Sequence, residues 1–236
     1  MHHLVLDDWS RKSSWIHARD PRAKLVAALA LVVAIGTSPG ASAVRFSGYA
    51  LLLGAAAACA GLPLAGTLLR ACVVLPFSAV FGAMAWAAGH PEQAVAVLLK
   101  SFLSAWVMVL LTATTSPPVL LRAMESFRAP RFLLLVTHIL YRYLFVISEQ
   151  AQHMRFAAAS RGGAGWRLRR GGWRAAAGAV ATLFARSHAR AEAVHRAMLA
   201  RGFRGDFVLL APLRFRAADG LFAAWAVATA TALRIL

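Results

Sequence analysis

The sequence is poor in acidic residues and in cysteine. Only 9 of its 236 residues are Asp or Glu, against 26 Lys and Arg, so the formal net charge is +17. The two cysteines, Cys59 and Cys72, lie in apolar runs, which excludes a secreted scaffold held together by disulfides. Charged residues make up 15% of the chain and hydrophobic residues 60%. This composition excludes a disordered chain and indicates a polytopic membrane protein with an unusually basic part.

The sequence also lacks the motifs of common enzymes. It contains no GxxxxGK[ST] phosphate loop, no HExxH, no CxxC and no GxSxG. Paired carboxylates for acid–base chemistry are absent, because Asp7 and Asp8 are adjacent in a polar segment. His188 and His195 share a face of an expected helix, but we identify no Asp, Cys or third His beside them. We therefore expect no enzyme activity, no metal site and no cofactor in this chain.

Long apolar runs are abundant. They cover about 22–37, 43–62, 66–88, 93–116, 131–148 and 217–236. The second, third and fourth reach the roughly 20 residues that a helix needs to cross a bilayer core of about 30 Å. The breaks between the runs carry Pro and Gly: Pro39-Gly40, Gly61-Leu62-Pro63, Gly89-His90-Pro91 and Ser116-Pro117-Pro118. The sequence therefore predicts an all-α fold, a polytopic membrane bundle of helices.

Basic residues near the ends of the runs indicate the topology. The N-terminal segment is basic, and so are the connections that carry Arg70 and residues 122–131, whereas those near 39 and 90 carry almost no charge. The positive-inside rule then places the N-terminus and residues 150–216 in the cytoplasm. A full crossing by 131–148 would put the basic region outside, so we expect that either this run or one early hairpin does not cross completely. For Lys100, inside the fourth run, we expect a structural role, either by snorkelling or by pairing within the bundle.

The basic region predicts two helices. Residues 151–216 hold 13 Arg against two acids, a net charge of +11. Good helix formers fill 145–161, and a second helix is expected over about 174–201. A connection rich in Gly and Arg, GGAGWRLRRGG, lies between them.

The ends of these two helices resemble each other. Arg161 follows Ala158 and Met154 at offsets of three and seven residues, and Arg201 follows Met198 and Val194 at the same offsets. These offsets place each arginine on the same face as a small or apolar stripe. A glycine follows each arginine, as the C-terminus of a helix favours. One such end is usually only a cap, but two copies in one basic block favour docking into acid-lined grooves, because Arg binds carboxylates bidentately.

Three features together resemble a known family. The N-terminal stretch Leu6–Leu25 contains Asp20-Pro21-Arg22-Ala23-Lys24-Leu25, and a Pro-rich connection covers Ser116–Pro130. The third feature is the pair of helix ends, Ser160-Arg161-Gly162 and Ala200-Arg201-Gly202. With them the chain resembles the transmembrane T component of energy-coupling factor (ECF) transporters, in the cobalt-type, CbiQ-like branch. The family signature is Ala-Arg-Gly: the second copy matches it, and the first has Ser160 in place of the alanine.

The resemblance implies a function. A T component is a non-catalytic scaffold that joins two cytoplasmic ABC-type ATPases to a membrane S component that captures the substrate, sometimes with a small accessory membrane subunit. It implies a multi-pass protein of the bacterial inner (plasma) membrane, with ATP and Mg bound by the partner ATPases and Arg161 and Arg201 as contact residues on long cytoplasmic coupling helices. Cobalt is the expected substrate; nickel and vitamins such as biotin are the alternatives.

The resemblance also implies an organisation along the chain. The expected parts are a cytoplasmic N-terminal segment (1–21), membrane-embedded helices (22–148), a cytoplasmic coupling-helix region (149–216) and a C-terminal membrane helix (217–236).

Two other classes of function compete with this one. A self-sufficient transporter would want carboxylates within the membrane or inverted repeats, and the apolar runs contain almost no acids. A binder of anionic lipid or nucleic acid could use the basic region, where Trp and Arg alternate in GWRLRRGGWR. A loop beside the membrane favours lipid headgroups over nucleic acid, so we expect no nucleic-acid partner.

Overall fold

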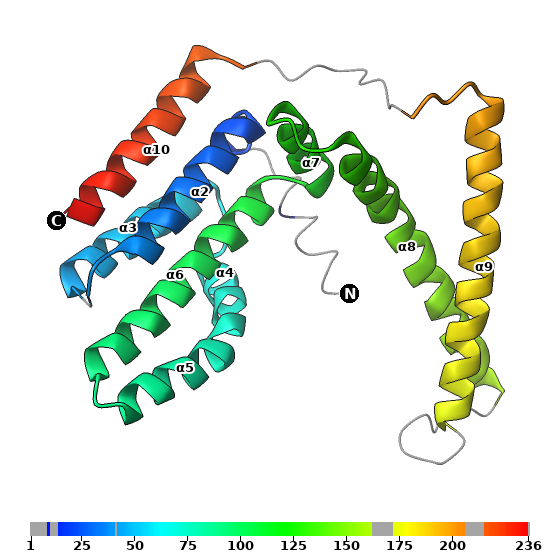
Figure 1. Cartoon of the computed structure of the whole chain (residues 1–236), viewed down its shortest axis with the longest axis horizontal. Coiled ribbons are helices and arrows are strands. Elements are labelled where there is room, and N and C mark those ends of the chain that lie inside the picture. Colours follow the sequence, from blue (N-terminus) through cyan, green and yellow to red (C-terminus); the bar gives the residue numbers. More distant parts are fainter. Residues whose placement is uncertain (1–8, 10–13, 41, 162–171, 206–214, 236) are drawn as a thin grey trace. The chain divides into compact units, whose positions relative to one another are not determined.

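The computed structural model describes residues 9, 14–40, 42–161, 172–205 and 215–235 (Figure 1). These residues are helical and include no strand, which confirms the expected all-α class. The chain divides into two units. Unit 1 consists of Met1–Phe127 and Ala211–Leu236, and unit 2 is Arg128–Leu210.

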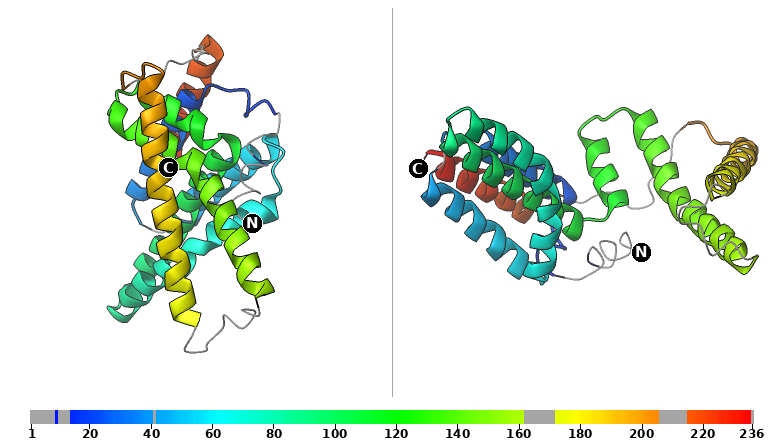
Figure 2. Two further views of the ribbon diagram at one scale, coloured as in Figure 1. Left: turned by 90° about the vertical axis from the view of Figure 1, so that its right-hand side faces the viewer. Right: turned by 90° about the horizontal axis from the view of Figure 1, so that it is seen from below.

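Unit 1 is a bundle with α6 at its centre. Its helices are α2 (Pro21–Thr37), α3 (Ala43–Cys59), α4 (Leu64–Ala71), α5 (Leu75–Ala87), α6 (Pro91–Thr114), α7 (Pro117–Ser126) and α10 (Ala217–Ile235), and the 3-10 turn η1 (Cys72–Val74) joins α4 to α5. Helix α6 contacts α2, α3, α4 and α5, while α10 packs along α2 and also touches α3 (Figure 2). The predicted breaks all lie at helix boundaries, with Pro91, Pro117 and Pro118 in the first turns of α6 and α7. The Pro-rich segment after α6, which we expected to be a connection, contains α7.

Local chemistry defines both ends of α2. Asp20 precedes the helix, its carboxylate accepts the Arg22 N–H at 2.9 Å, and Pro21 occupies the first turn, where its missing N–H costs nothing. At the C-terminal end, Lys100 Nζ donates to the carbonyl oxygens of Ser38 (2.7 Å) and Gly36 (3.4 Å). A cation suits this negative end of the helix dipole. Lys100 therefore pairs within the bundle, which is one of its two expected roles.

The core of unit 1 lies where α3, α4 and α6 meet. Tyr49 and Thr67 are completely buried, and Trp106 is 4% exposed. Each polar atom in this core has a partner: Tyr49 Oη donates to the Ala230 carbonyl (3.2 Å), and Trp106 Nε1 donates to Thr67 Oγ1 (3.2 Å). Because a buried polar group costs free energy unless it is bonded, these contacts fix α10 and α4 against the centre.

The helix lengths bear on how the chain crosses the membrane. Within the described residues, Leu64–Ala87, Pro91–Thr114 and Phe132–Ser160 are long and apolar enough to span a bilayer. The α2 and α3 helices have 17 residues each, or about 25 Å at 1.5 Å per residue, which is less than a core of about 30 Å. By length, the first hairpin falls short of a crossing, whereas the run 131–148, which continues within Phe132–Ser160, is long enough.

Unit 2 contains two long helices, α8 (Arg131–Ser160) and α9 (Gly172–Ala200). Helix α9 matches the predicted 174–201 to within two residues. Helix α8 continues for 30 residues, so the apolar run 131–148 and the predicted helix 145–161 form one element. The expected domain boundary between 148 and 149 lies in the middle of this helix, while the division between the units falls at Phe127 and Arg128.

Candidate functional site

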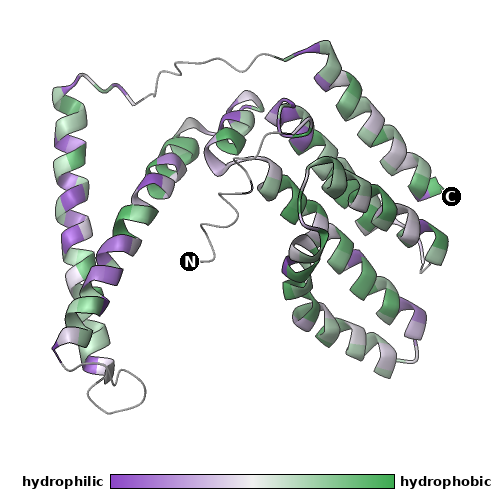
Figure 3. Cartoon of the chain, turned by 180° about the vertical axis from the view of Figure 1, so that it is seen from behind, coloured by the Kyte–Doolittle hydropathy of each residue, from purple (hydrophilic) through white to green (hydrophobic). Residues whose placement is uncertain are grey.

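The side chains of unit 2 are exposed almost throughout. None of its described residues is buried, although several are large and apolar. On α9, Trp173 is 84% exposed and Phe184 is 73% exposed. Figure 3 shows apolar and polar residues interleaved along both helices of this unit. Exposed aromatic side chains among charged ones are typical of a surface that binds a partner.

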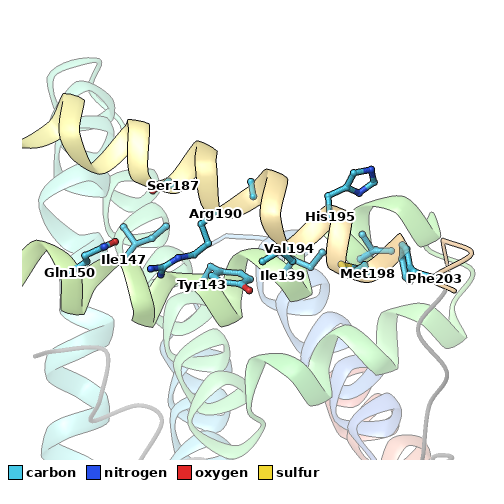
Figure 4. A pocket seen from close by; sticks show the side chains of 12 residues that line it. Ile139, Tyr143, Ile147, Gln150, Ser187, Arg190, Val194, His195, Met198 and Phe203 are labelled. Carbon is cyan, nitrogen blue, oxygen red and sulfur yellow. The ribbon is translucent and has the colours of Figure 1, made fainter. Parts of the chain in front are cut away.

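The two helices of unit 2 form an antiparallel hairpin, α8–α9 (Figure 1). Two grooves line its seam. The first has a volume of about 350 Å³ and is mostly apolar, with α8 residues 135–150 facing α9 residues 187–198 (Figure 4). Gln150, Ser187 and Arg190 are its main polar residues, and Figure 4 shows the Arg190 side chain reaching toward α8 beside Tyr143.

The second groove lies nearer the C-terminal end of α8. It has a volume of about 670 Å³, and small residues from both helices line much of it. Three arginines also line it: Arg155, Arg161 and Arg186. Met154 and Ala158 line this groove together with Arg161, so the predicted stripe and arginine do share one side of α8. Small residues leave the seam wide here, and the arginines make it positive.

The C-terminal end of α9 carries the second signature in a well-defined geometry. Gly202 has a φ of +76°, a left-handed conformation that favours glycine. The Phe203 N–H donates to the Met198 carbonyl (3.0 Å) and the Gly202 N–H to the Leu199 carbonyl (2.9 Å). These two bonds are the Schellman arrangement, and they confirm the predicted glycine cap. Arg201 is the residue at which the helix turns, and it is exposed.

The C-terminal end of α8 carries the first signature. The helix ends at Ser160, and Arg161 follows as the capping residue with a φ of −89°. The Ser160 hydroxyl donates to the Ala157 carbonyl (3.0 Å). Ser160, which stands in place of the alanine of the signature, therefore forms its hydrogen bond within the last turn of α8. Arg161 is exposed. Gly162, the third residue of this signature, lies outside the described residues.

The two arginine tips lie at opposite ends of the hairpin. Because α8 and α9 are antiparallel, the C-terminus of one is beside the N-terminus of the other (Figure 1). The 29 residues of α9 correspond to about 43 Å at 1.5 Å per residue. Sequence reasoning predicted both tips and their faces but not this separation, since it depends on how the helices pair.

The described acids of unit 2, Glu149 and Glu192, contact neighbouring residues on their own helices. Glu192 bridges His188 (3.8 Å) and Arg196 (3.6 Å), and Glu149 lies 3.7 Å from His153. In all three pairs the residues are four positions apart, about one helical turn, and they are exposed, so each pair contributes little to stability. Glu192 is thus an acidic neighbour of His188 that we did not predict from the sequence.

The N-terminal family motif belongs to a different place, a buried charge cluster in unit 1. The cluster consists of Arg19, Asp20, Lys24 and Asp219. Lys24 Nζ donates to the carbonyl oxygens of His17 and Thr114, both at 3.1 Å. Asp219 Oδ1 accepts the Asp20 N–H (3.3 Å) and lies 3.7 Å from Arg19 Nη1.

The cluster is well shielded from solvent. Asp20 and Lys24 are each 6% exposed and Asp219 is 4% exposed. Charged groups can be buried at this level only when they are paired and hydrogen-bonded. Arg22, the remaining charged residue of the motif, is half-buried, and its Nε has no hydrogen-bond partner in the described part of the chain.

Sequence reasoning missed Asp219. It is the third residue of α10, and its Oδ2 accepts the N–H of Arg216, the residue before the helix, at 3.1 Å. A carboxylate at this position is a recognisable start signal for a helix. The available signal was therefore an acid at the beginning of the last apolar run.

The fold defines the class of the protein first: an all-α membrane protein, with a bundle and an exposed hairpin whose two ends carry arginine. A sequence model of the Cobalt transport protein family, CbiQ, matches residues 12–209. The Cobalt transport protein CbiQ of Rhodobacter capsulatus is 30% identical over 190 residues, which cover 77% of this chain and 76% of that protein. The chain therefore belongs to the CbiQ family of cobalt transport proteins and is a membrane component of cobalt transport.

Proposed function

We propose that the chain is the non-catalytic transmembrane scaffold of an ATP-driven ECF importer. In this function the α8–α9 hairpin couples two cytoplasmic ABC-type ATPases to a membrane S component that binds the ion. The ATPases would supply ATP and Mg binding. Family membership supports cobalt as the transported ion, and the expected setting is the bacterial inner membrane. The proposal places the hairpin on the cytoplasmic side, which requires that α8 does not cross the bilayer, although its length and composition would allow a crossing.

One observation carries the proposal: two similar arginine tips, Arg161 and Arg201, stand at opposite ends of one hairpin. A separation of about 43 Å along α9 is too long for one small ligand to bridge, but it suits two partner subunits side by side. Each tip presents a guanidinium at a helix C-terminus, where the helix dipole already favours positive charge. The matching groups on the partners would be carboxylates.

The described contacts leave both tips free to bind. Neither Arg161 nor Arg201 makes a side-chain hydrogen bond or ion pair within the described residues, whereas Arg196 on the same surface pairs with Glu192. A guanidinium that is exposed and has no partner among the described residues loses little on binding. The apolar groove between Leu135 and Met198 offers the S component a surface of the opposite character.

The test is association of the ATPase pair with the chain. Arg161→Ala and Arg201→Ala should each weaken association about 10- to 100-fold, since a charge-assisted hydrogen bond is worth about 1.5–3 kcal/mol. The double variant should lose more than either single one. Binding is measured by copurification from membranes in which the chain is expressed together with the ATPases and the S component of an ECF system.

Arg196→Ala is the matched control. It removes one positive charge from the same helix, five residues from Arg201, and leaves the tip intact. Association should change less than twofold. Unchanged copurification by the double variant would refute the assignment of the tips, and a wild-type chain that transports the ion without any ATPase would support the alternative of a self-sufficient transporter. Uptake assays with cobalt, nickel and biotin separate the remaining substrates.

A further inference from the structure

The buried charge cluster joins the ends of three helices of unit 1. Lys24 lies in the first turn of α2, Asp219 lies in the first turn of α10, and the Thr114 carbonyl belongs to the last turn of α6. The Lys24–Thr114 bond ties α2 to α6, and the Asp20–Asp219 bond ties α2 to α10. All three ends therefore meet around two carboxylates and one ammonium group.

The electrostatics of these helix ends is complementary. Asp20 and Asp219 lie at the positive N-terminal ends of α2 and α10, while the ammonium of Lys24 contacts the negative C-terminal end of α6. Arg19 adds a second cation beside Asp219, and its guanidinium also stacks on Trp15 at 4.1 Å. Because removing one member leaves another buried charge without its partner, the cluster resists separation of the three ends.

The cluster also lies close, along the chain, to both segments that connect unit 1 with unit 2. The chain leaves unit 1 after α6 and α7, and it returns to unit 1 shortly before α10. Thr114 and Asp219 thus mark the two routes by which unit 2 is attached to the bundle. Helix α7, on the outgoing route, also packs on α2. The cluster therefore fixes both attachments to the same helix.

We propose that Lys24, Asp20 and Asp219 are positioning residues of the coupling step: they hold the two attachments of unit 2 together, so that a displacement of the α8–α9 hairpin moves the membrane bundle. This inference rests on the proposed function, since it assigns a role within the same coupling. Without the cluster, the two attachments can move independently of each other. The ATPases would then displace the hairpin without displacing the bundle.

The test compares Lys24 with Lys100. Both lysines donate to carbonyl oxygens at the C-terminal end of a helix: Lys24 lies at the N-terminal end of α2 and binds the end of α6, and Lys100 binds the C-terminal end of α2. Lys24→Met removes the bond to Thr114, and Lys100→Met removes the bonds to Gly36 and Ser38. Both variants are assembled with the ATPases and S component in proteoliposomes, and Co²⁺ uptake and ATP hydrolysis are measured together. Lys24→Met should lower uptake at least tenfold while hydrolysis stays within about threefold of wild type. Lys100→Met should retain the wild-type ratio of uptake to hydrolysis.

Two further variants, one conservative and one isosteric, distinguish a loss of coupling from misfolding. Lys24→Arg keeps the charge and should restore part of the uptake, whereas Asp219→Asn keeps the shape and should uncouple uptake from hydrolysis as Lys24→Met does. The inference is overturned if uptake and hydrolysis fall together in proportion to the folded fraction of each variant, or if Lys24→Met and Lys100→Met behave alike. Failure of the wild-type chain to bind the ATPases would instead overturn the proposed function.

Discussion

The two units of this chain solve the problem of burying apolar side chains in different ways. Unit 1 buries Tyr49, Leu53 and Trp106 among its own helices, and the polar atoms of Tyr49 and Trp106 are hydrogen-bonded there. Unit 2 buries none of its described residues, although Trp173 and Phe184 are among them. The exposed apolar residues of α5 in unit 1 and of α8 in unit 2 lie on candidate membrane spans, for which lipid is a suitable environment, but α9 is not such a span. The difference teaches that unit 1 has a core of its own, whereas unit 2 presents its apolar side chains to its surroundings.

The largest expected effect is on the core of unit 1. Trp106→Ala removes a buried indole and leaves the Thr67 hydroxyl without its donor, so it should lower the free energy of unfolding by about 3–5 kcal/mol. Phe184→Ala, an aromatic truncation on α9, should change it by less than about 0.5 kcal/mol in the isolated chain. Denaturant unfolding of the chain in detergent micelles measures both. Equal losses would show that unit 2 has a core of its own and would remove the contrast between the units.

An intermediate effect is expected at the C-terminal end of α2. Lys100→Met keeps most of the apolar stem but removes two bonds to carbonyl oxygens, so the free energy of unfolding should fall by about 1–2 kcal/mol. The same unfolding assay measures it. An unchanged midpoint of denaturant unfolding would mean that water or lipid headgroups satisfy these carbonyl oxygens equally well. Lys100 would then not order the end of α2 any more than the exposed ends of α8 and α9 are ordered.

The smallest effects are expected from two glycines of unit 2. Gly202→Ala forces an alanine into a left-handed conformation, at a cost of about 1 kcal/mol, and should fray the end of α9 that presents Arg201. Gly178→Ala, within α9 and with no atom near the added methyl group, should stabilise the helix by about 0.5–1 kcal/mol.

Hydrogen exchange of the amides near residue 200 measures these effects. Protection should fall in Gly202→Ala and should not fall in Gly178→Ala. The same change of protection in both variants would mean that the glycine cap does not order the end of α9 that presents Arg201.

Much of the fold could be predicted from the sequence because its signals are local. Pro and Gly separate the helices at the predicted places, and Gly202 ends α9 as its position indicates. The α7 helix was missed because two prolines suggested a connection, yet Pro at the first turn is compatible with a helix. The continuity of α8 was missed because its composition changes midway from apolar to mixed, while its backbone does not.

The candidate sites could be predicted only in part. The residues of both arginine tips followed from spacing and from the resemblance, but their places at opposite ends followed from the pairing of α8 with α9. The buried charge cluster could not be assembled from the sequence. Asp20 and Asp219 are 199 residues apart, and no periodicity links the start of α2 to the start of α10.

The sequence by itself determined the class of this protein, the helices, most of their ends and the arginines that mark the hairpin, because composition, periodicity and capping act within a few residues. Only the tertiary structure decided which helix ends meet, which charges are buried together and how far apart the two tips stand. Those outcomes depend on packing between distant segments, where α2, α6 and α10 meet only because α10 returns to the bundle after the whole of unit 2.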